Sequence, residues 1–470
     1  MFVGREYELK QLDKFLRNEK QSVAVIYGRR RIGKSELIRR SLQKRNAFFF
    51  EGLENRPQKS QIANFILQLG RQVESLTANQ TPKTWREAFF LLEKPLKKKP
   101  ACIVLDEFQW MANYRREIVA DLKMVWDQCL SSIPRVHLIL CGSIASFMIT
   151  KVIKSNALYG RTDLVVHLKS FCLAETKRLL HQKGIDEVID AQMLLGGVPK
   201  YLELIGNWPS VHLAIEELAF CENGYFLDEY DRIFTSHFGK NRDYEKIVRV
   251  LVAHPYGLFR KELSKLTGIA LGGRLSDMLS NLKSAGFITS VIPFDKGSAS
   301  KTIKYFIHDA YLRFYFAFIQ PNRKKIESAP PKGLFTRITQ SGKFYAWRGR
   351  AFEFLCIDHA QKLAELLGFS AVDYLYGPYF RSASAKITGV QIDLLFDRAD
   401  KVITLCEMKC SRTPLGKKII EEIEKKVKIL ESFFPSKTIQ RVLVVHGELT
   451  STIKDSGYFY RIVKARELVK

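Results

Sequence analysis

A glycine-rich segment near the N-terminus has the residue types and spacing of a phosphate-binding loop. An apolar run, residues 22–27, precedes it and a helix-like run, residues 35–42, follows it. In such a loop the backbone N–H groups surround phosphate oxygens, and the following helix adds the positive end of its dipole. We expect Lys34 to reach the β- and γ-phosphates of ATP and Ser35 to ligate Mg²⁺. A glycine-rich turn without a ligand is the alternative. The predicted loop is Gly28, Arg29, Arg30, Arg31, Ile32, Gly33, Lys34 and Ser35.

Two adjacent acids follow a second apolar run, Cys102-Ile103-Val104-Leu105. We expect Asp106 to hold the magnesium through water and Glu107 to orient or deprotonate the attacking water. An acidic pair that caps a helix is the alternative, and the complete phosphate loop upstream makes it the weaker one.

Three further residues have types that could act on a nucleotide. Ser143 follows the apolar run 136–141 and could contact the γ-phosphate, although a strand-ending turn explains the same pattern. Arg161 could stabilise the transferring phosphoryl group, and a salt bridge accounts for it equally well. Pro199 belongs to Gly197-Val198-Pro199, which by itself predicts only a rigid turn before a helix.

A second group of chemically capable residues lies near the C-terminus. Asp393 falls on one expected strand, Glu407 and Lys409 share a face of the next, and Glu353 lies on a preceding helix. Asp393 and Glu407 could hold Mg²⁺ and activate a water for attack on a phosphodiester, with Lys409 neutralising charge. The alternatives are an ordinary salt bridge and a fold that binds without cutting.

The expected elements place these residues on several domains. Short apolar runs at 22–27, 47–50, 101–105 and 136–141 alternate with helices, which predicts a parallel sheet covered on both faces. Three short helices and a hairpin then resemble a winged helix. Its candidate phosphate contacts are Arg260, Lys261, Lys265, Arg274, Lys301 and Lys304. Packing against protein is the alternative there.

Charge and cysteine usage limit the partners and the compartment. The 470-residue chain has 75 Lys and Arg against 49 Asp and Glu, a net charge of +26. This excess fits a nucleic-acid partner, although it also fits a basic surface that only aids solubility. The eight cysteines are scattered without zinc-ligand spacing, which predicts reduced thiols and the cytoplasm. We expect neither a signal peptide nor a membrane span.

Four of these segments resemble the prokaryotic ATPase family common in archaea, of the AAA+/STAND group. They are Phe2-Val3-Gly4-Arg5-Glu6, Tyr27-Gly28-Arg29-Arg30-Arg31, Leu105-Asp106-Glu107-Phe108 and Leu158-Tyr159-Gly160-Arg161. The resemblance implies an ATP-driven switch, with Pro199 in a GxP element near the nucleotide. It also implies a winged helix followed by a nuclease-like domain.

The C-terminal order of helix-Glu, strand-Asp and strand-Glu-x-Lys is similar to the PD-(D/E)xK nuclease fold. Gln391-Ile392 stands where that pattern has a proline before the aspartate. The expected fold class is therefore α/β and multidomain. It comprises a P-loop NTPase parallel sheet (1–173), a helical lid (174–240), a winged helix (241–320), a linker (321–340) and an α/β restriction-endonuclease-like domain (341–470).

Three functions agree with the sequence. In the first, ATP state gates a metal-dependent nuclease that acts on nucleic acid, most simply DNA. In the second, the chain is an ATP-dependent switch whose C-terminal domain only docks a protein or nucleic acid. In the third, it is a transcription factor that uses the winged helix. The sequence leaves open a protein partner, a homo-oligomer and the choice between DNA and RNA.

Overall fold

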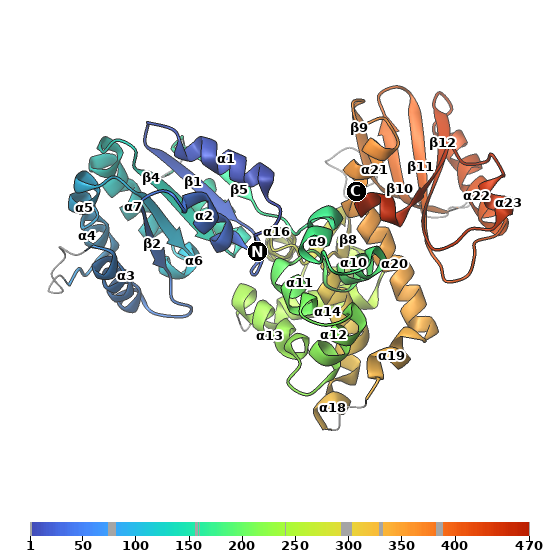
Figure 1. Ribbon diagram of the computed structural model, residues 1–470, viewed down its shortest axis with the longest axis horizontal. Coiled ribbons are helices and arrows are strands. Elements are labelled where there is room, and N and C mark those ends of the chain that lie inside the picture. The colour runs from blue at the N-terminus through green and yellow to red at the C-terminus, as the bar shows by residue number, and fades with distance from the viewer. Residues whose placement is uncertain are drawn as a thin grey trace. The chain divides into compact units, whose positions relative to one another are not determined.

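The computed structural model (Figure 1) describes residues 2–73, 81–155, 158, 160–239, 241–292, 303–328, 332–381 and 389–469. The chain divides into two compact units. The first is Met1–Ser170 with Ser280–Ala285, and the second is Phe171–Leu279 with Gly286–Lys470.

The first unit is built on a five-stranded parallel sheet with the strand order β2-β3-β4-β1-β5. The predicted parallel α/β sheet is thus confirmed. One strand, β5, is absent from the sequence prediction, because it lies at the sheet edge and alternates exposed with half-buried residues. The strands are β1 (Ser22–Tyr27), β2 (Ala47–Glu51), β3 (Cys102–Asp106), β4 (His137–Gly142) and β5 (Thr162–His167).

Helices cover both faces of this sheet because successive side chains on each strand point to opposite sides. On β1, Val23 and Val25 join one apolar cluster, and Ala24 and Ile26 join the other. Helices α3 (Gln58–Gln72), α4 (Trp85–Phe90), α5 (Glu93–Lys98) and α7 (Glu117–Gln128) close the first cluster, and α1 (Glu6–Leu16) and α2 (Lys34–Leu42) close the second. Short helices α6 (Phe108–Met111) and α8 (Ala145–Phe147) follow β3 and β4, and a π-helical turn spans Met148–Ile153.

The second unit begins with helices in the region predicted to be a lid. In this unit α10 contacts both α17 and α20. The helices are α9 (Leu173–Leu179), α10 (Ile185–Leu195), α11 (Pro199–Gly206), α12 (Val211–Phe220), α13 (Tyr225–Phe238), α17 (Ala310–Phe314) and α20 (Gly342–Asp358).

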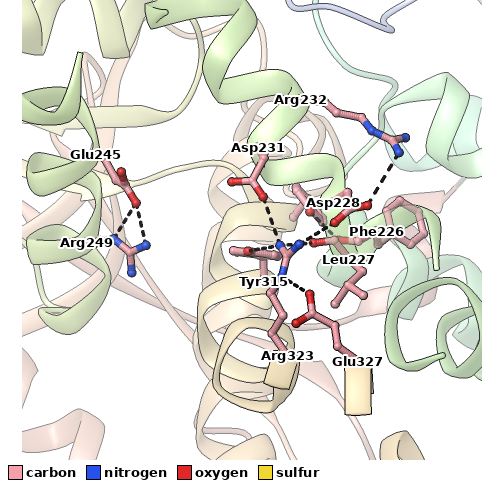
Figure 2. A network of polar contacts seen from close by, with 11 residues as sticks. Phe226, Leu227, Asp228, Asp231, Arg232, Glu245, Arg249, Tyr315, Arg323 and Glu327 are labelled. Atoms are coloured by element: carbon pink, nitrogen blue, oxygen red, sulfur yellow. Dashed lines mark hydrogen bonds and ion pairs between the residues drawn. The ribbon is translucent and has the colours of Figure 1, made fainter. Parts of the chain in front are cut away.

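Residues 321–340, interpreted as a linker, contain helices that pack on this bundle. They are α18 (Gln320–Ser328), which continues from a π-helical segment at Tyr315–Ile319, and α19 (Leu334–Thr339). Figure 2 shows Arg323 on α18 reaching α13, where it pairs with Asp228 (2.6 Å) and Asp231 (3.1 Å) and donates to the Leu227 carbonyl. The polar sequence therefore reflects an ion-pair network and not a free connection.

In the chain, three helices and a small sheet lie between α13 and α17. Strand β8 lies between β6 and β7, and both pairings are antiparallel. The elements are α14 (Arg242–Ala253), β6 (Leu258–Phe259), α15 (Arg260–Thr267), α16 (Gly273–Ser284), β7 (Ile288–Val291) and β8 (Lys304–Ile307). The expected hairpin tip and Lys301 lie outside the described residues, and the winged-helix assignment stays a prediction.

The C-terminal part is a mixed five-stranded sheet with the order β13-β12-β11-β10-β9. Strands β9, β10 and β11 run antiparallel, whereas β11, β12 and β13 run parallel. Apolar residues of α22, such as Ile423 and Val427, pack on one face. The elements are α21 (Ala360–Leu366), β9 (Tyr374–Arg381), β10 (Val390–Arg398), β11 (Val402–Cys410), α22 (Lys418–Phe433), β12 (Thr438–His446), α23 (Ser451–Lys454) and β13 (Arg461–Lys464). Within the part of the chain described, no helix has the length and apolar character to cross a bilayer.

A buried histidine joins the start of the bundle to the end of α20. The Nε2 atom of His359 accepts from the Leu173 N–H (2.9 Å), and its Nδ1 lies 2.8 Å from the Leu355 carbonyl, to which it donates. These two contacts fix a neutral imidazole. Burial lowers the pKa of His359 below its usual value.

We therefore predict an acid-labile contact between α9 and α20. Because the pKa is depressed in the folded chain, the unfolded chain takes up this proton first as the pH falls below about 6.5. Stability contributed by His359 is complete above that pH and is lost below it, by up to about 1.4 kcal/mol per pH unit. Urea unfolding followed by pulsed hydrogen exchange of α9 and α20 at pH 7, 6 and 5 measures this loss. His359→Gln should flatten the dependence, and an unchanged slope in this variant would contradict the assignment.

Candidate nucleotide site and carboxylate cluster

The predicted phosphate loop leaves the carboxyl end of β1 beside the carboxyl end of β5. The Leu168 N–H donates to the Tyr27 carbonyl (2.8 Å). This pairing brings the two chains so close that a Cβ on Gly28 would lie 2.4 Å from the Leu168 oxygen. Only glycine fits at the first position of the loop.

The loop has the backbone of an anion-binding nest. Arg31 and Gly33 both adopt left-handed conformations, with φ of 70° and 87°. Left-handed residues within a turn direct successive N–H groups to one side. Helix α2 then begins at Lys34, so its unpaired N–H groups and positive dipole end lie at the same point.

The lysine of the loop is held within it. Lys34 is 6% exposed, and its ammonium donates to the carbonyls of Gly28 (3.1 Å) and Arg29 (3.0 Å). The N-terminal segment braces the same loop, because the buried Arg5 donates to the carbonyls of Ile32 (3.3 Å) and Lys169 (2.6 Å).

The two predicted magnesium ligands of this unit are in direct contact. The Ser35 hydroxyl donates to a carboxylate oxygen of Asp106 at 2.5 Å. Mg²⁺ usually takes one or two protein oxygens and fills its remaining positions with water and phosphate oxygens. A serine hydroxyl and a carboxylate placed together at the start of α2 fit that ion.

Glu107 is oriented by two neighbours, one of which the sequence analysis missed. Its Oε2 accepts from the Ser143 hydroxyl (2.7 Å), from the Ser143 N–H (3.3 Å) and from the Gln109 amide (2.5 Å). Among the described residues Oε1 has no hydrogen-bond partner, so it can accept a proton from water. Ser143, which could contact the γ-phosphate, holds Glu107 in this structure, and its contact with phosphate stays a prediction. No sequence pattern marks Gln109, which is fully buried.

A third acid borders Asp106 and Glu107. Glu51 ends β2 opposite Asp106 on β3. Burial raises the pKa of Glu51, and the charges of Asp106 and Glu107 raise it further. The sequence prediction ended this strand one residue early and so passed over the polar residue at its tip.

The outer part of the loop contacts the segments after β2 and β3. Arg30 pairs with Glu54 (3.3 Å), and its guanidinium lies 5.5 Å from the centre of the Trp110 ring. Ile32 points inward and is buried in the second apolar cluster.

The prediction that Arg161 serves the phosphates of its own chain is wrong. Arg161 precedes β5, and its guanidinium makes a two-pronged pair with Asp127 (2.8 and 2.9 Å) near the end of α7. The loop lies at the opposite end of the parallel strands, about 20 Å away for six residues at about 3.3 Å each. The alternative salt-bridge interpretation accounts for this residue.

Pro199 lies in the second unit, as the first residue of α11. The turn before it packs tightly, because the Phe171 N–H donates to the Gly197 carbonyl (2.7 Å) and a Cβ on Gly197 would lie 1.9 Å from the Phe171 oxygen. The rigid turn is present, and its role at the nucleotide stays a prediction.

The structure places the C-terminal acids near one another. Glu353 on α20 and Asp393 on β10 face each other closely enough to interact electrostatically. Lys409 contacts Glu407 on the same strand (3.0 Å). The β10 register against β9 shifts between Ile392 and Leu395, which places Asp393 at an irregularity of the kind that re-aims side chains.

The pKa values of both facing carboxyls are raised. Burial raises the pKa of Glu353 to about 7, with Asp393 adding to the rise. Burial also raises the pKa of Asp393 to about 6, with Glu407 adding to it. Two half-buried carboxyls that repel each other are stabilised by a cation, which is an electrostatic property that metal sites share.

Protein cations already neutralise part of this cluster. Glu353 pairs with Arg350, and the almost fully buried Glu407 pairs with Lys409 and with Lys426 of α22 (2.7 Å). Lys426 is a partner that the sequence analysis missed. Over the described ranges no three histidine, cysteine, aspartate or glutamate side chains are arranged around one metal position. Glu407 would have to exchange a lysine contact before it could ligate a metal ion.

The predicted phosphate contacts of residues 241–320 differ in their surroundings. Arg260 donates to the Gly272 carbonyl (2.6 Å), and Arg274 pairs with Asp243 (2.5 Å), so both stabilise the local fold. Lys261 and Lys265 are exposed on α15.

Comparison with known proteins supports the assignment of the first unit. Residues 2–205 match the model of an ATPase domain found predominantly in Archaea. An uncharacterized protein of Methanocaldococcus jannaschii is 27% identical over 356 residues, which are 75% of this chain and 76% of the relative.

Two solved structures are similar to part of this chain. A Walker-type ATPase of Pyrococcus abyssi is 21% identical with a TM-score of 0.49, over 66% of this chain and 95% of that one. The ORC2 protein of Aeropyrum pernix is 17% identical with a TM-score of 0.40, over 72% of this chain and 95% of that one. The parallel sheet and the loop after β1 have the arrangement of a P-loop ATPase, and residues 2–205 are similar to that ATPase domain family.

Proposed function

We propose that the protein binds and hydrolyses ATP with Mg²⁺ as a nucleotide-controlled switch of the AAA+/STAND type. The observation that carries this proposal is the contact between Ser35 and Asp106, with Glu107 next in the chain and its Oε1 without a hydrogen-bond partner among the described residues. These groups converge on the anion nest at the carboxyl edge of one parallel sheet.

Each residue has a defined task in this reaction. The N–H groups between Gly28 and Ser35 bind the phosphates, and Lys34 exchanges its carbonyl partners for phosphate oxygens. Ser35 and Asp106 would hold Mg²⁺, which supplies charge neutralisation at the phosphates when bound. Glu107 accepts a proton from the attacking water through Oε1 while Ser143 fixes Oε2.

The first test separates binding from hydrolysis. Glu107→Gln keeps the size of the side chain but removes the base, so phosphate release should fall by at least about 100-fold. Nucleotide binding should persist in this variant and be lost in Lys34→Ala. Radiolabelled ATP retention and phosphate release measure the two properties. Glu117→Gln, an exposed acid at the start of α7, is the matched control, and equal hydrolysis by both glutamine variants would contradict the role of Glu107.

We further propose that ATP state gates a metal-dependent nuclease activity at the C-terminal acids, with DNA as the substrate and the +26 net charge assisting binding. Asp393 and Glu407 would hold Mg²⁺ with Glu353 beside them, and Lys409 would neutralise charge on the phosphodiester. The support is the half-buried, mutually repelling pair of Glu353 and Asp393 and the adjacent lysine.

The second test compares two lysines of the C-terminal part. Plasmid DNA incubated with Mg²⁺ or Mn²⁺ should be nicked by the natural protein. Lys409→Ala should reduce nicking by about 100-fold or more, since removing one electrostatic stabiliser typically costs that much. Lys428→Ala, an exposed lysine on α22, should cut normally. Equal cleavage by both variants would remove the nuclease proposal.

A non-catalytic docking role is the second candidate, and one observation favours it. Arg350, Lys409 and Lys426 already neutralise Glu353 and Glu407. In that role the natural protein and Lys409→Ala would be equally inactive on DNA, while ATP hydrolysis would remain.

A further inference from the structure

Glu353 and Asp393 line a cleft. Other elements of the second unit form another side of this cleft. That side is formed by strands β7 and β8 together with the turn before β6, and Lys304, Phe306 and Tyr256 line it. Arg350 and Phe380 line the cleft beside the acids. The whole cleft lies within the second unit.

Lys304 is a half-buried cation without a carboxylate contact among the described residues. Its ammonium lies 4.6 Å from the centre of the Phe380 ring and 5.2 Å from that of Phe259, and 3.5 Å from the Tyr256 carbonyl. Burial lowers the pKa of Lys304, with the charge of Arg350 adding to the effect and Glu262 opposing it. A cation kept partly out of water without an ion pair gains most from an anionic ligand.

Aromatic faces accompany this cation. Tyr256 is 63% exposed at the cleft, and the Arg350 guanidinium lies 5.3 Å from the centre of its ring. The ring centres of Phe259 on β6 and Phe380 on β9 lie 6.3 Å apart. Proteins that bind single-stranded nucleic acid combine cations that bind phosphates with aromatic rings that stack on bases. Unpaired bases are accessible for such stacking.

We propose that this cleft binds a single strand of nucleic acid, with Lys304 on a phosphate and Tyr256 stacked on a base, and so leads the strand to Glu353 and Asp393. Delivery of the strand to the acids rests on the proposed nuclease function. Binding of the strand in the cleft does not depend on that function. Recognition is thereby assigned to the cleft wall and not to the exposed lysines of α15.

The test measures binding without cleavage. Anisotropy of a fluorescein-labelled oligo(dT) is recorded for the full chain in EDTA over a range of salt concentrations. Lys304→Gln should weaken binding and lower the salt slope by about 0.7, the value for one contact with a single strand. Tyr256→Leu should weaken binding at least about fivefold. Lys304→Arg keeps the charge and should bind as the natural protein does, which separates lost charge from a damaged fold.

Controls decide between surfaces. Lys428→Gln should bind normally, and so should the pair Lys261→Gln and Lys265→Gln. Natural affinity in both Lys304→Gln and Tyr256→Leu, or a loss confined to the α15 pair, would overturn the inference. If the natural protein binds through Lys304 but never cleaves with Mg²⁺, the nuclease proposal fails while the cleft assignment stands.

Discussion

The hydrogen bond between Ser35 and Asp106 depends on the order of the strands in the parallel sheet. Ser35 follows the loop after β1, Asp106 ends β3, and β4 lies between these two strands. Because parallel strands end at the same edge, the residue after β4 must lie between the loop and the acids. Ser143 occupies that place and contacts Glu107. The sheet thus fixes Glu107, the Ser35–Asp106 pair and the anion nest relative to one another.

The C-terminal sheet solves a different electrostatic problem. Acidic side chains that repel each other lie close together on this sheet and on α20. Their repulsion is offset by cations from three elements: Arg350 on α20, Lys409 on β11 and Lys426 on α22. Removing one cation leaves a buried charge unpaired, which is costly, whereas a ligand cation can take the same place. This arrangement would suit a site that stays neutral until metal and substrate arrive.

Motifs within one strand and its turn could be predicted from the sequence, whereas partners from distant segments could not. Gly28 to Ser35, Asp106 and Glu107 carry their chemistry in adjacent residues. Gln109 and Lys426 become functional neighbours only after folding. The sequence left Arg161 equally open to a phosphate contact and to a salt bridge. Because β5 was not recognised, the position of Arg161 at the start of that strand, far from the loop, could not be predicted. Residues 321–340 looked like a linker because they are polar, yet α18 is held by the ion pairs of Arg323 and α19 buries Leu334 and Phe335.

Isothermal titration calorimetry of the intact chain with ATP and Mg²⁺ tests the central assignment most directly. The account predicts saturable heat at one nucleotide per chain, weakened when Mg²⁺ is withheld and abolished in Lys34→Ala. A folded natural protein that gives no heat, or one whose heat is unchanged by Lys34→Ala, would contradict it.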